Sequence, residues 1–564
     1  MIQMKQVRYL LFIILSVFFT HSVFAENTLR ERVYVQTDKQ TYLAGELLWM
    51  KFYLTDETGK PSLFSKIGYV ELLNESEVQV QVKLDIINGV GEGWIELPVS
   101  LPTGNYSLTA YTRSMRNEGE SVFFNKTIGI FNTFKTDAAI GIDTVPPDVS
   151  AFSFSGSENN LSVATGKQMY KTRSQGEIHL QGLPENIHSL SISVAGEDFI
   201  ANTGNIIKWN NQLPDYAKIQ LKNDFLPEYE GHIICGRIVN SLTNQPPEGH
   251  LVSSILGFTG DQLRVFGGVV DSEYNVQFIT TRITGTKGMA IANYTSSDDE
   301  YRVNIQSPFE THSDKTLPAL RLNTAWKDRL LQRSVGLQVL YAYVADSMSR
   351  VDSTYAHFQW KADRSYILDE YTRFTTMEEI AIEFIHAIRF RRFENKYFLS
   401  VFIDENNTFS SGNTLVTLDG IPITDYGIIF KYSPLLVYKI DIYKEKYVFG
   451  DKRYEGVVAF TTYKNDYPGL VLGGSTHLFD YEGTQLHRYF YSPSYQEKSD
   501  IDSKIPDYRH TLLWAPEVET GGQSALSVPF STSDLTGEFQ VTVEGLCKDG
   551  KVFRGTSLFK VENP

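Results

Sequence analysis

The chain has few of the residues that form covalent cross-links or cross a membrane. Only two of its 564 residues are cysteines, Cys235 and Cys547, and they lie far apart in strand-like segments. Two cysteines do not make a disulfide scaffold, so we expect two buried free thiols, with a disulfide between them as the alternative that export permits. No stretch after the N-terminal segment reaches the ~18 uninterrupted apolar residues that a membrane-spanning helix needs. We therefore expect no transmembrane span.

Sequence signatures of catalysis are also missing. The chain has no Gly-x-Ser-x-Gly nucleophile turn, no His-Glu-x-x-His zinc site, and no Walker lysine or dinucleotide-binding glycine loop. None of the eleven histidines is paired with another at i, i+4 on a helix, and His386 is interpreted as a partly buried structural residue. We expect a protein that is not an enzyme and holds no cofactor and no metal.

The chain has fewer positively charged than negatively charged residues. Lysine and arginine number 52 against 67 acidic residues, which gives a formal net charge of −15. An acidic protein repels the phosphate backbone, so we expect no nucleic-acid partner.

The N-terminal residues 1–25 have the pattern of a secretory signal peptide. Lys5 and Arg8 precede an apolar run over residues 9–19, and Val23-Phe24-Ala25 forms a small-residue cleavage site. The run is short for a membrane anchor, which is the weaker alternative. Residue 26 is Glu rather than Cys, so we expect an exported protein of the periplasm or the outer-membrane-associated envelope that is not a lipoprotein.

The remaining composition is typical of a mainly β protein. Aromatic residues make up 13% of the chain, and Tyr, Thr, Val and Ile recur in alternating patterns. Residues 33–54 predict two strands around a turn, and residues 101–112 predict a turn and an alternating strand. These segments resemble the second macroglobulin domain (MG2) of the α2-macroglobulin family, a β-sandwich. The matching residues are Thr37, Asp38, Tyr42, Gly45 and Gly104-Asn105-Tyr106, whereas Ala44 replaces the usual proline. Any immunoglobulin-like sandwich is the alternative.

Short echoes of this segment recur along the chain. Lys167-Gln168-Met169-Tyr170 repeats Lys39-Gln40-Thr41-Tyr42 after a Pro-containing linker over residues 143–150. Residues 536–542 repeat residues 103–109 near the C-terminus. The echoes predict a second macroglobulin-like sandwich to about Tyr229 and a further sandwich at the C-terminus.

Residues 231–257 form a strand, a polar turn and a second strand. Through Gly236-Arg237-Ile238-Val239, Thr243 and Pro246 they resemble the carboxypeptidase regulatory-like domain, a β-sandwich without catalytic residues of its own. Apolar residues at helical spacing then predict a helix over residues 323–348. A second helix is predicted over residues 375–390, with a capping box at its start.

Residues 415–423 read LVTLDGIPI, and residues 440–462 read IDIYKEKYVFGDKRYEGVVAFTT. They resemble the plug domain of TonB-dependent outer-membrane receptors, although Lys444-Glu445-Lys446 stands where the family has Lys-Gly-Pro. In those receptors a barrel follows the plug, and 22 strands of roughly 9–11 residues need over ~200 residues. The segment after residue 465 is about half as long, and no TonB-box-like segment is evident near the mature N-terminus. We expect a plug-like docking module rather than a transporter.

Five residues of the plug-like segment are candidates for docking a partner. Asp419 and Gly420 form either a recognition site or an ordinary turn, in which Asp accepts local hydrogen bonds and Gly takes a positive φ. Tyr443, Lys444 and Tyr447 belong to a Tyr- and Lys-rich stretch that is either an exposed binding face or a half-buried strand.

The expected architecture is mainly β, with tandem immunoglobulin-like or macroglobulin-like β-sandwiches and one plug-like α/β domain. The expected divisions are a signal peptide over 1–25, an MG2-like sandwich over 26–132, a second macroglobulin-like sandwich over 133–229, a carboxypeptidase regulatory-like sandwich over 230–306, a helical connector over 307–364, the plug-like domain over 365–466 and a C-terminal sandwich over 467–564. This combination resembles envelope proteins of Bacteroidota-type bacteria.

Two functions are open from these residues. The first is a non-enzymatic envelope scaffold or binding protein, accessory to an outer-membrane receptor or transport complex, with an outer-membrane barrel or another envelope protein as partner. The second is a macroglobulin-like endopeptidase inhibitor or protease-binding protein. It would act without a thioester, because neither cysteine lies in a Gly-Cys-Gly-Glu-Gln run.

Overall fold

The computed structural model describes residues 30–135, 141–143, 161–196, 224–247, 249–295, 299–314, 316–348, 350–352, 360–394, 396–403 and 407–563. The predicted signal peptide and nearly all of the predicted linker over 143–150 lie outside these residues. The described part is mainly β, with several sheets and few helices, as expected. Within it no helix is long and apolar enough to cross a membrane.

The first sandwich follows the strand order β1-β3-β6-β5-β4-β7-β8-β2. Strand β5 pairs with β4 along most of its length and with β6 at its end, so it joins the two layers. The two layers enclose a core that includes Phe52, Leu72 and Ile128, all fully buried. Its strands are β1 (Glu31–Thr37), β2 (Thr41–Leu43), β3 (Leu47–Asp56), β4 (Ile67–Asn74), β5 (Glu77–Ile87), β6 (Val90–Glu96), β7 (Gly104–Tyr111) and β8 (Phe124–Phe131), with 3-10 turns at Ser114–Asn117 and Glu120–Val122.

The second sandwich is assembled from two segments that are far apart in the sequence. One layer has the order β10-β12-β33 and the other β11-β35-β34-β13-β32. Its strands are β10 (Ser162–Thr165), β11 (Met169–Lys171), β12 (Gln175–Gln181), β13 (Ile187–Gly196), β32 (Thr511–Ala515), β33 (Ala525–Ser531), β34 (Gly537–Cys547) and β35 (Val552–Glu562). The segments expected to form separate sandwiches over 133–229 and 467–564 therefore pair in the same sheets, which corrects that expectation. Each segment alone would leave its apolar face without a second layer.

The second sandwich repeats the plan of the first. The order β13-β34-β35-β11 matches β4-β7-β8-β2, and β10-β12-β33 matches β1-β3-β6. In both sandwiches a short strand pairs in parallel with the last one, β2 with β8 and β11 with β35. The echo between residues 39–42 and 167–170 thus marks equivalent strands. Where the first sandwich has the tight β4–β5 turn, the second carries residues 197–510 as an insertion.

The third sandwich lies within this insertion, in the order β19-β14-β17-β16-β15-β18-β30. Six of its strands lie within the predicted 230–306 segment, but β30 comes from the segment that we had expected to join a C-terminal sandwich. Strand β30 pairs antiparallel with β18 along its whole length and so extends that layer. The strands are β14 (Ile233–Asn240), β15 (Val252–Phe258), β16 (Val265–Val270), β17 (Asn275–Ile279), β18 (Thr286–Thr295), β19 (Tyr301–Ile305) and β30 (Thr476–Glu482).

Residues 360–474 form an α/β unit, called here the tip module. Its main sheet has the order β22-β28-β29-β26-β27, and a smaller sheet has the order β23-β24-β25. The strands are β22 (Arg364–Ile367), β23 (Ile388–Phe393), β24 (Lys396–Ile403), β25 (Thr408–Phe409), β26 (Leu415–Leu418), β27 (Ile421–Ile423), β28 (Val437–Phe449) and β29 (Lys452–Thr462). The helices are α3 (Met377–Glu383) and α4 (Tyr426–Lys431), with 3-10 turns at Leu368–Glu370 and Pro434–Leu436.

The helix predicted over residues 375–390 is only half right. Its capping box is confirmed, because Thr376 accepts from the Glu379 N–H and Glu379 accepts from the Thr376 N–H. The helix ends at Glu383, and Ile388–Phe393 forms strand β23 paired with β24. Ile388 and Phe390 alternate with arginines, which is the two-residue period of a strand. The helical spacing applies only to the residues upstream of them.

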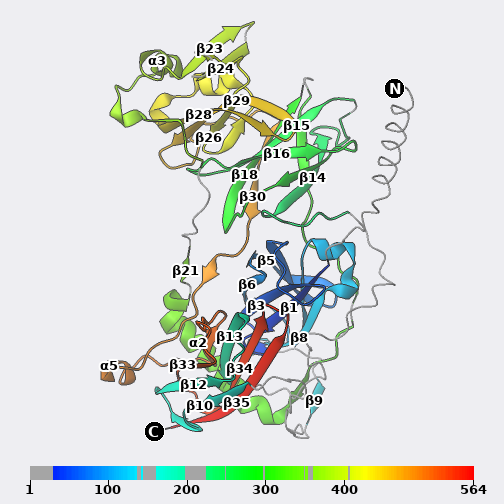
Figure 1. Ribbon diagram of the computed structural model, residues 1–564, viewed down its shortest axis with the longest axis vertical. Coiled ribbons are helices and arrows are strands. Elements are labelled where there is room, and N and C mark those ends of the chain that lie inside the picture. The colour runs from blue at the N-terminus through cyan, green and yellow to red at the C-terminus, as the bar shows by residue number, and fades with distance from the viewer. Residues whose placement is uncertain are drawn as a thin grey trace, which may run out of the picture.

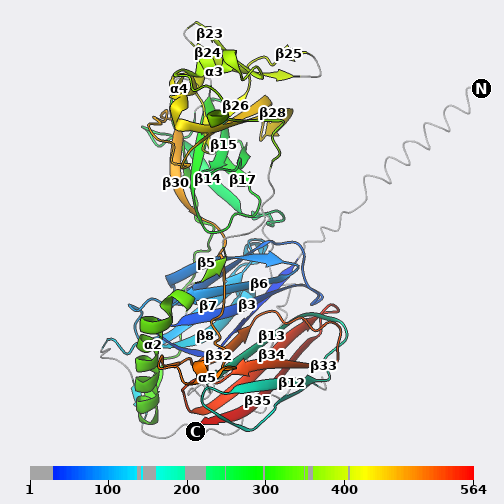
Figure 2. The ribbon, with the colours of Figure 1, turned by 90° about the vertical axis from the view of Figure 1, so that its left-hand side faces the viewer.

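The helix predicted over residues 323–348 is confirmed as α2 (Lys327–Met348), preceded by a 3-10 turn at Thr324–Trp326. Leu330 and Leu337 of α2 pack on Leu43 and Phe131 of the first sandwich. The helix runs alongside the first two sandwiches (Figure 2). The remaining elements are small: β9 (Gly141–Asp143) pairs with β20 (Arg321–Asn323), β21 (Val351–Asp352) pairs with β31 (His487–Arg488), and α5 is Lys498–Ile501.

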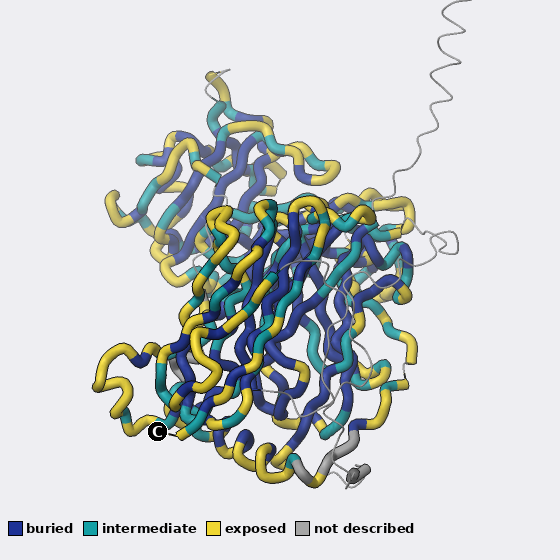
Figure 3. Tube along the Cα trace, turned by 60° about the horizontal axis from the view of Figure 1, so that its bottom comes forward, coloured by how far each residue is buried: buried dark blue, intermediate teal, exposed yellow. Residues whose placement is uncertain are grey.

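The molecule is elongated (Figure 1). The tip module lies at one end of the long axis, the third sandwich lies in the middle, and the first two sandwiches form the base beside the C-terminus. Figure 3 shows buried strands running side by side through the base, with exposed turns at their ends. The N-terminal and C-terminal segments of the described chain therefore form the base, and the segment between them forms the third sandwich and the tip module.

The split second sandwich makes a prediction about stability. Phe559 of β35 is 3% exposed and packs against Tyr170, Phe530 and Phe539. Phe559→Ala should cost about 3–5 kcal/mol because it leaves a cavity. Limited proteolysis, with the fragments identified by mass spectrometry, should show new cleavage in both residues 161–196 and residues 507–563.

The matched control is Leu558→Ala on the same strand, since Leu558 is 51% exposed and its loss should change stability by less than about 0.5 kcal/mol. Cleavage of Phe559→Ala confined to the C-terminal segment would contradict one shared sandwich.

Candidate functional site

The segment Thr37-Asp38-Lys39, which carries the macroglobulin resemblance, is buried where both base sandwiches and α2 meet. The Asp38 carboxylate accepts hydrogen bonds from Tyr42 Oη at 2.7 Å and from the Trp49 N–H at 3.1 Å. It also accepts from Thr511 Oγ1 of the second sandwich at 2.7 Å. The motif therefore fixes its own turn and joins the first sandwich to the second.

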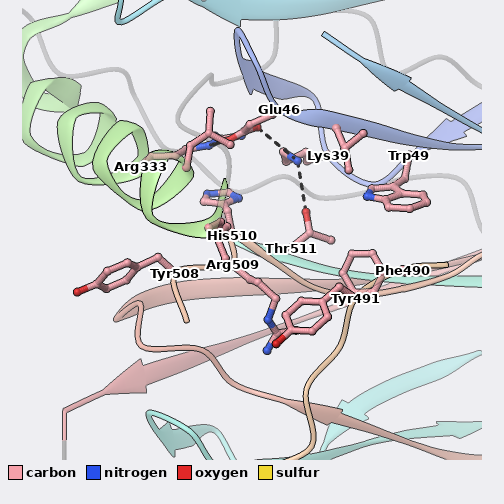
Figure 4. A pocket seen from close by; sticks show the side chains of 13 residues that line it. Lys39, Glu46, Trp49, Arg333, Phe490, Tyr491, Tyr508, Arg509, His510 and Thr511 are labelled. Atoms are coloured by element: carbon pink, nitrogen blue, oxygen red, sulfur yellow. Dashed lines mark hydrogen bonds and ion pairs between the residues drawn. The ribbon is translucent and has the colours of Figure 1, made fainter. Parts of the chain in front are cut away.

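A cavity of about 80 Å³ lies at this junction, and Figure 4 shows the side chains around it. Lys39 Nζ lies 3.0 Å from Asp38 and 3.5 Å from Glu46, and Arg333 of α2 holds Glu46 through two hydrogen bonds of 2.7 and 2.6 Å. The other lining residues are Leu47, Trp49, Leu337, Leu340, Phe490, Tyr491, Tyr508, Arg509, His510 and Thr511.

Two titratable groups of this junction have shifted pKa values. Burial alone would raise the pKa of Glu46, but the charges of Arg333 and Lys39 outweigh it and bring the pKa to about 2. Burial, followed by the nearby Arg333 charge, holds the pKa of His510 well below its usual range. The junction therefore contains a fixed carboxylate–cation network beside a neutral histidine, with little room for a ligand.

The same local bonding recurs in the second sandwich. Thr37 Oγ1 donates to the Lys39 carbonyl oxygen at 2.6 Å, and Thr165 Oγ1 donates to the Lys167 carbonyl oxygen at 2.8 Å. In each case the lysine N–H donates to the hydroxyl of the tyrosine three residues on. The motif thus stabilises the same local turn in both sandwiches. The copy in the first sandwich also lies at the junction with α2.

A second junction joins the first and third sandwiches. Glu228 is fully buried there and accepts from Tyr69 Oη at 3.0 Å and from the Ile233 N–H at 2.8 Å. Burial raises its pKa to about 7, although the Ile233 N–H, the Arg113 charge and the Tyr69 hydroxyl act in the opposite direction. Arg282 of the third sandwich adds an ion pair of 2.6 Å to Asp85 of the first.

A third junction joins the third sandwich to the tip module at glycine–glycine contacts. A Cβ at Gly257 would lie 2.1 Å from the Gly420 carbonyl oxygen, and one at Gly267 would lie 1.9 Å from the Gly450 N. No side chain fits between backbones this close. Ile255 and Val265 of the sandwich also share a hydrophobic cluster with Leu415 and other tip residues, so these two units form one packed body.

Asp419 and Gly420 lie at this junction and form a turn. Asp419 is fully buried at φ +50°, and its carboxylate accepts from the Thr462 N–H, Thr462 Oγ1 and the Tyr467 N–H at 2.6–2.8 Å. Gly420 follows at φ +83°. The interpretation as a turn is confirmed, and the alternative role in docking an external partner is corrected because both residues are enclosed by the protein itself.

The other predicted docking residues lie on β28. Tyr443 is 4% exposed and packs edge-on against Trp360, so it offers no external surface either. Tyr447 is half-buried against the same tryptophan. Lys444 alone faces an open site, where its Nζ lies 5.9 Å from the Phe402 ring centroid. His386, expected to be partly buried, is exposed beside Lys444 in that site.

That site is a groove of about 660 Å³ in the tip module, called here the tip groove. Aromatic residues line part of it, called here its floor, and the cations among its lining residues are Arg364, Arg389 and Lys444. The lining residues are Arg364 and Tyr366 of β22, Glu378, Ala381 and Ile382 of α3, His386, Ala387, Ile388, Arg389 and Phe390 leading into and along β23, Phe402, Phe409 and Lys444. The sequence prediction missed it, because its residues come from five strands and a helix.

Metal-binding side chains are not gathered into a site in the part of the chain described above. No group of three or more His, Cys, Asp or Glu side chains there could hold a metal ion. Both cysteines are free, as expected, but only Cys547 of the two is buried. Cys547 is buried, which raises the pKa of its thiol to about 11, while Cys235 is half-buried and its Sγ accepts from Arg113 at 3.1 Å.

The contacts at the base junction predict that Arg333 contributes strongly to the stability of the protein. Arg333→Met keeps the apolar stem but leaves the buried Glu46 carboxylate with Lys39 as its nearest cation, and should cost about 3–5 kcal/mol. Adding Glu46→Gln should restore part of the loss. The free energy of unfolding in urea measures both. Exposed Arg329→Met on the same helix is the matched control, and equal losses in the two single variants would contradict a buried network.

The raised pKa of Glu228 predicts a pH dependence. Between the ordinary value of 4.5 and about 7 the folded protein keeps a proton that the unfolded chain releases. This contribution to stability therefore falls as pH rises through that window, by up to about 3 kcal/mol, and is constant above it. Urea unfolding measures the free energy of unfolding at pH 5 and at pH 8. The difference between the two values should be smaller for Glu228→Gln than for the unaltered protein, whereas exposed Glu230→Gln should show the same difference as the unaltered protein. An unchanged difference in Glu228→Gln would refute the shift.

No protein-family model and no curated protein matches the chain. Among solved structures it is similar to the Salmonella α2-macroglobulin reacted with methylamine, at 11% identity and TM-score 0.24 over 95% of this chain and 40% of that one. The Escherichia coli α2-macroglobulin activated by porcine elastase aligns at 10% identity and TM-score 0.25, over 95% and 44%. The Yersinia pseudotuberculosis adhesin InvE aligns at 11% identity and TM-score 0.13, over 48% and 58%. The chain spans less than half the length of these α2-macroglobulins.

Proposed function

We propose that the protein is a non-enzymatic binding protein of the cell envelope that presents its tip module to a partner protein. The observation that carries this proposal is the tip groove: an open site of about 660 Å³ on a module at the end of the long axis (Figure 1). A groove of this size, with an aromatic floor and a few charged groups, fits a binding role. The junction cavity in the base is much smaller and is lined by structural ion pairs.

The partner proposed is an outer-membrane barrel or another envelope protein, with this protein as an accessory or scaffold of a receptor or transport complex. The support is the resemblance of residues 415–423 and 440–462 to a receptor plug. Those residues form β26, β27 and the β28–β29 hairpin of one sheet. The signal-peptide pattern supports export to that compartment.

The way the tip module is held also favours presentation to a partner. It shares a core with the third sandwich, which is joined to the base by the Arg282–Asp85 ion pair and by Gln485, whose side chain accepts from the Trp94 N–H and donates to the Trp94 carbonyl oxygen. Strands β21 and β31 tie the chain entering the tip to the chain returning from it. Such a rigid support lowers the entropy lost when the tip binds.

A protease-binding role is the second candidate, and the macroglobulin-like motif with its two sandwiches of the same plan favours it. The motif itself is buried at the base junction, so a protease would have to engage other surfaces.

The proposal predicts where a partner is contacted. A photo-crosslinking amino acid at Phe393 of the tip, 66% exposed, should capture one outer-membrane protein in cells. The same amino acid at Leu242 of the third sandwich, 90% exposed, and at Leu558 of the base, 51% exposed, should not. The measurement is the mass spectrum of each cross-linked adduct.

Equal adducts from all three positions, or none from Phe393, would contradict presentation by the tip. A protease as the adduct, retained after a single cleavage of the chain, would replace the proposal with the protease-binding candidate.

A further inference from the structure

The tip groove combines cations and aromatic rings in one continuous arrangement. The Arg389 guanidinium lies 4.0 Å from the centroid of the Phe409 ring, and Phe409 meets Phe402 edge-on at 5.2 Å. Lys444 Nζ lies 5.9 Å from the centroid of the Phe402 ring. Each of the two phenylalanine rings thus has a cation near it, and the cation–π contacts favour these positions of the charged groups.

The charge of the groove is opposite to that of the whole protein. Arg364, Arg389 and Lys444 line it together with one acidic residue, Glu378, whereas the chain as a whole has a formal charge of −15. Among the residues that the structure describes, neither Arg364 nor Arg389 has an ion-pair partner. Two arginines without an ion-pair partner there, one of which lies over an apolar ring, favour a ligand that supplies carboxylates in an otherwise acidic protein.

The shape of the groove favours an extended peptide. Ile388, Arg389 and Phe390 all line it, although consecutive side chains of a strand point to opposite faces. A site touched by three consecutive residues reaches the edge of β23, and Phe402 of β24 and Phe409 of β25 extend it over one face of the small sheet. Strand β23 is the outer strand of its sheet, and β22 across the groove is the outer strand of the main sheet. Outer strands offer unpaired backbone groups to an added strand.

The size of the ligand is limited by the charge of the rest of the chain. A long polyanion would extend beyond the groove into the field of the acidic surface. A short segment would not, because charges more than about 8 Å apart are largely screened at physiological ionic strength. The groove therefore fits a segment with one or two carboxylates near its cations and apolar side chains over Phe402 and Phe409.

Building on the function proposed above, we propose that the tip groove binds an extended, acidic and aromatic peptide segment of the partner protein. The segment adds as a strand to the outer edge of β23. Its carboxylates pair with Arg364, Arg389 and Lys444, and its aromatic side chains lie over the groove floor.

The test uses the full chain and a fluorescent six-residue peptide, the length of β23, that alternates Glu and Tyr. Fluorescence anisotropy should show saturable binding that weakens with added salt. The variant Arg364→Glu with Arg389→Glu should weaken binding at least about tenfold, because like charges then face each other. The matched control reverses two exposed cations of the same module outside the groove, Lys431→Glu with Arg453→Glu, and should bind as the unaltered protein does.

Three comparison ligands separate the possible outcomes. A Lys-Tyr peptide should not bind, and methylation of alternate backbone amides in the Glu-Tyr peptide should abolish binding. Equal binding of the Lys-Tyr peptide, or competition by free glutamate at the concentration of the peptide, would overturn the peptide assignment. Loss of peptide binding in the control variant would do the same.

The same variants separate this inference from the proposed function. If the Phe393 adduct forms but persists in Arg364→Glu with Arg389→Glu, the tip still meets its partner and only the groove assignment fails. If no adduct forms in any variant, the proposed function itself fails.

Discussion

The arrangement of the whole molecule depends on the closure of the second sandwich around its insertion. Strand β13 pairs with β34 and, at its last residues, with β32, so the chain that leaves the base at Gly196 must return beside it. The Gly196 N–H donates to the His510 carbonyl oxygen at 2.9 Å and closes the base of the insertion. Because the entropy of closing a loop grows only with the logarithm of its length, one hairpin can carry several folded units at little further cost.

The return point is also where the buried charges gather. His510 lines the junction cavity beside Lys39, Glu46 and Arg333, so the exit from the insertion, the first sandwich and α2 are fixed in one place. The low pKa of Glu46 shows that the attraction of its two cations outweighs the cost of burial. At the second junction the effect of burial is larger, because no ion pair of comparable geometry reaches Glu228 from the described residues, and its pKa rises. The two carboxylates give the two ends of the base opposite responses to pH.

Local features of the fold followed from the sequence, and pairing between distant segments did not. The capping box at Thr376, helix α2 and the Asp419–Gly420 turn each depend on residues within a few positions of one another, so their side-chain chemistry predicts them. Strand echoes identified equivalent strands, but an alternating pattern does not specify its partner. Two halves of one sandwich therefore looked like two sandwiches. The tip groove escaped prediction for the same reason, since it forms only when β22, β23, β25 and β28 come together.

The burial of the plug-like signature changes what it can do in this chain. In the turn LDGIPI the glycine permits contact between backbones, with the Gly420 carbonyl oxygen filling the space that a side chain at Gly257 would need. The face of the tip module that carries the signature is therefore used to join the third sandwich. Outside this junction, β23 lies at the edge of its sheet, and Arg364 and Arg389 are exposed and available to a partner. A docking function of the tip would thus depend on the charge and edge geometry of this groove, to which the plug-like segment contributes Lys444 of β28.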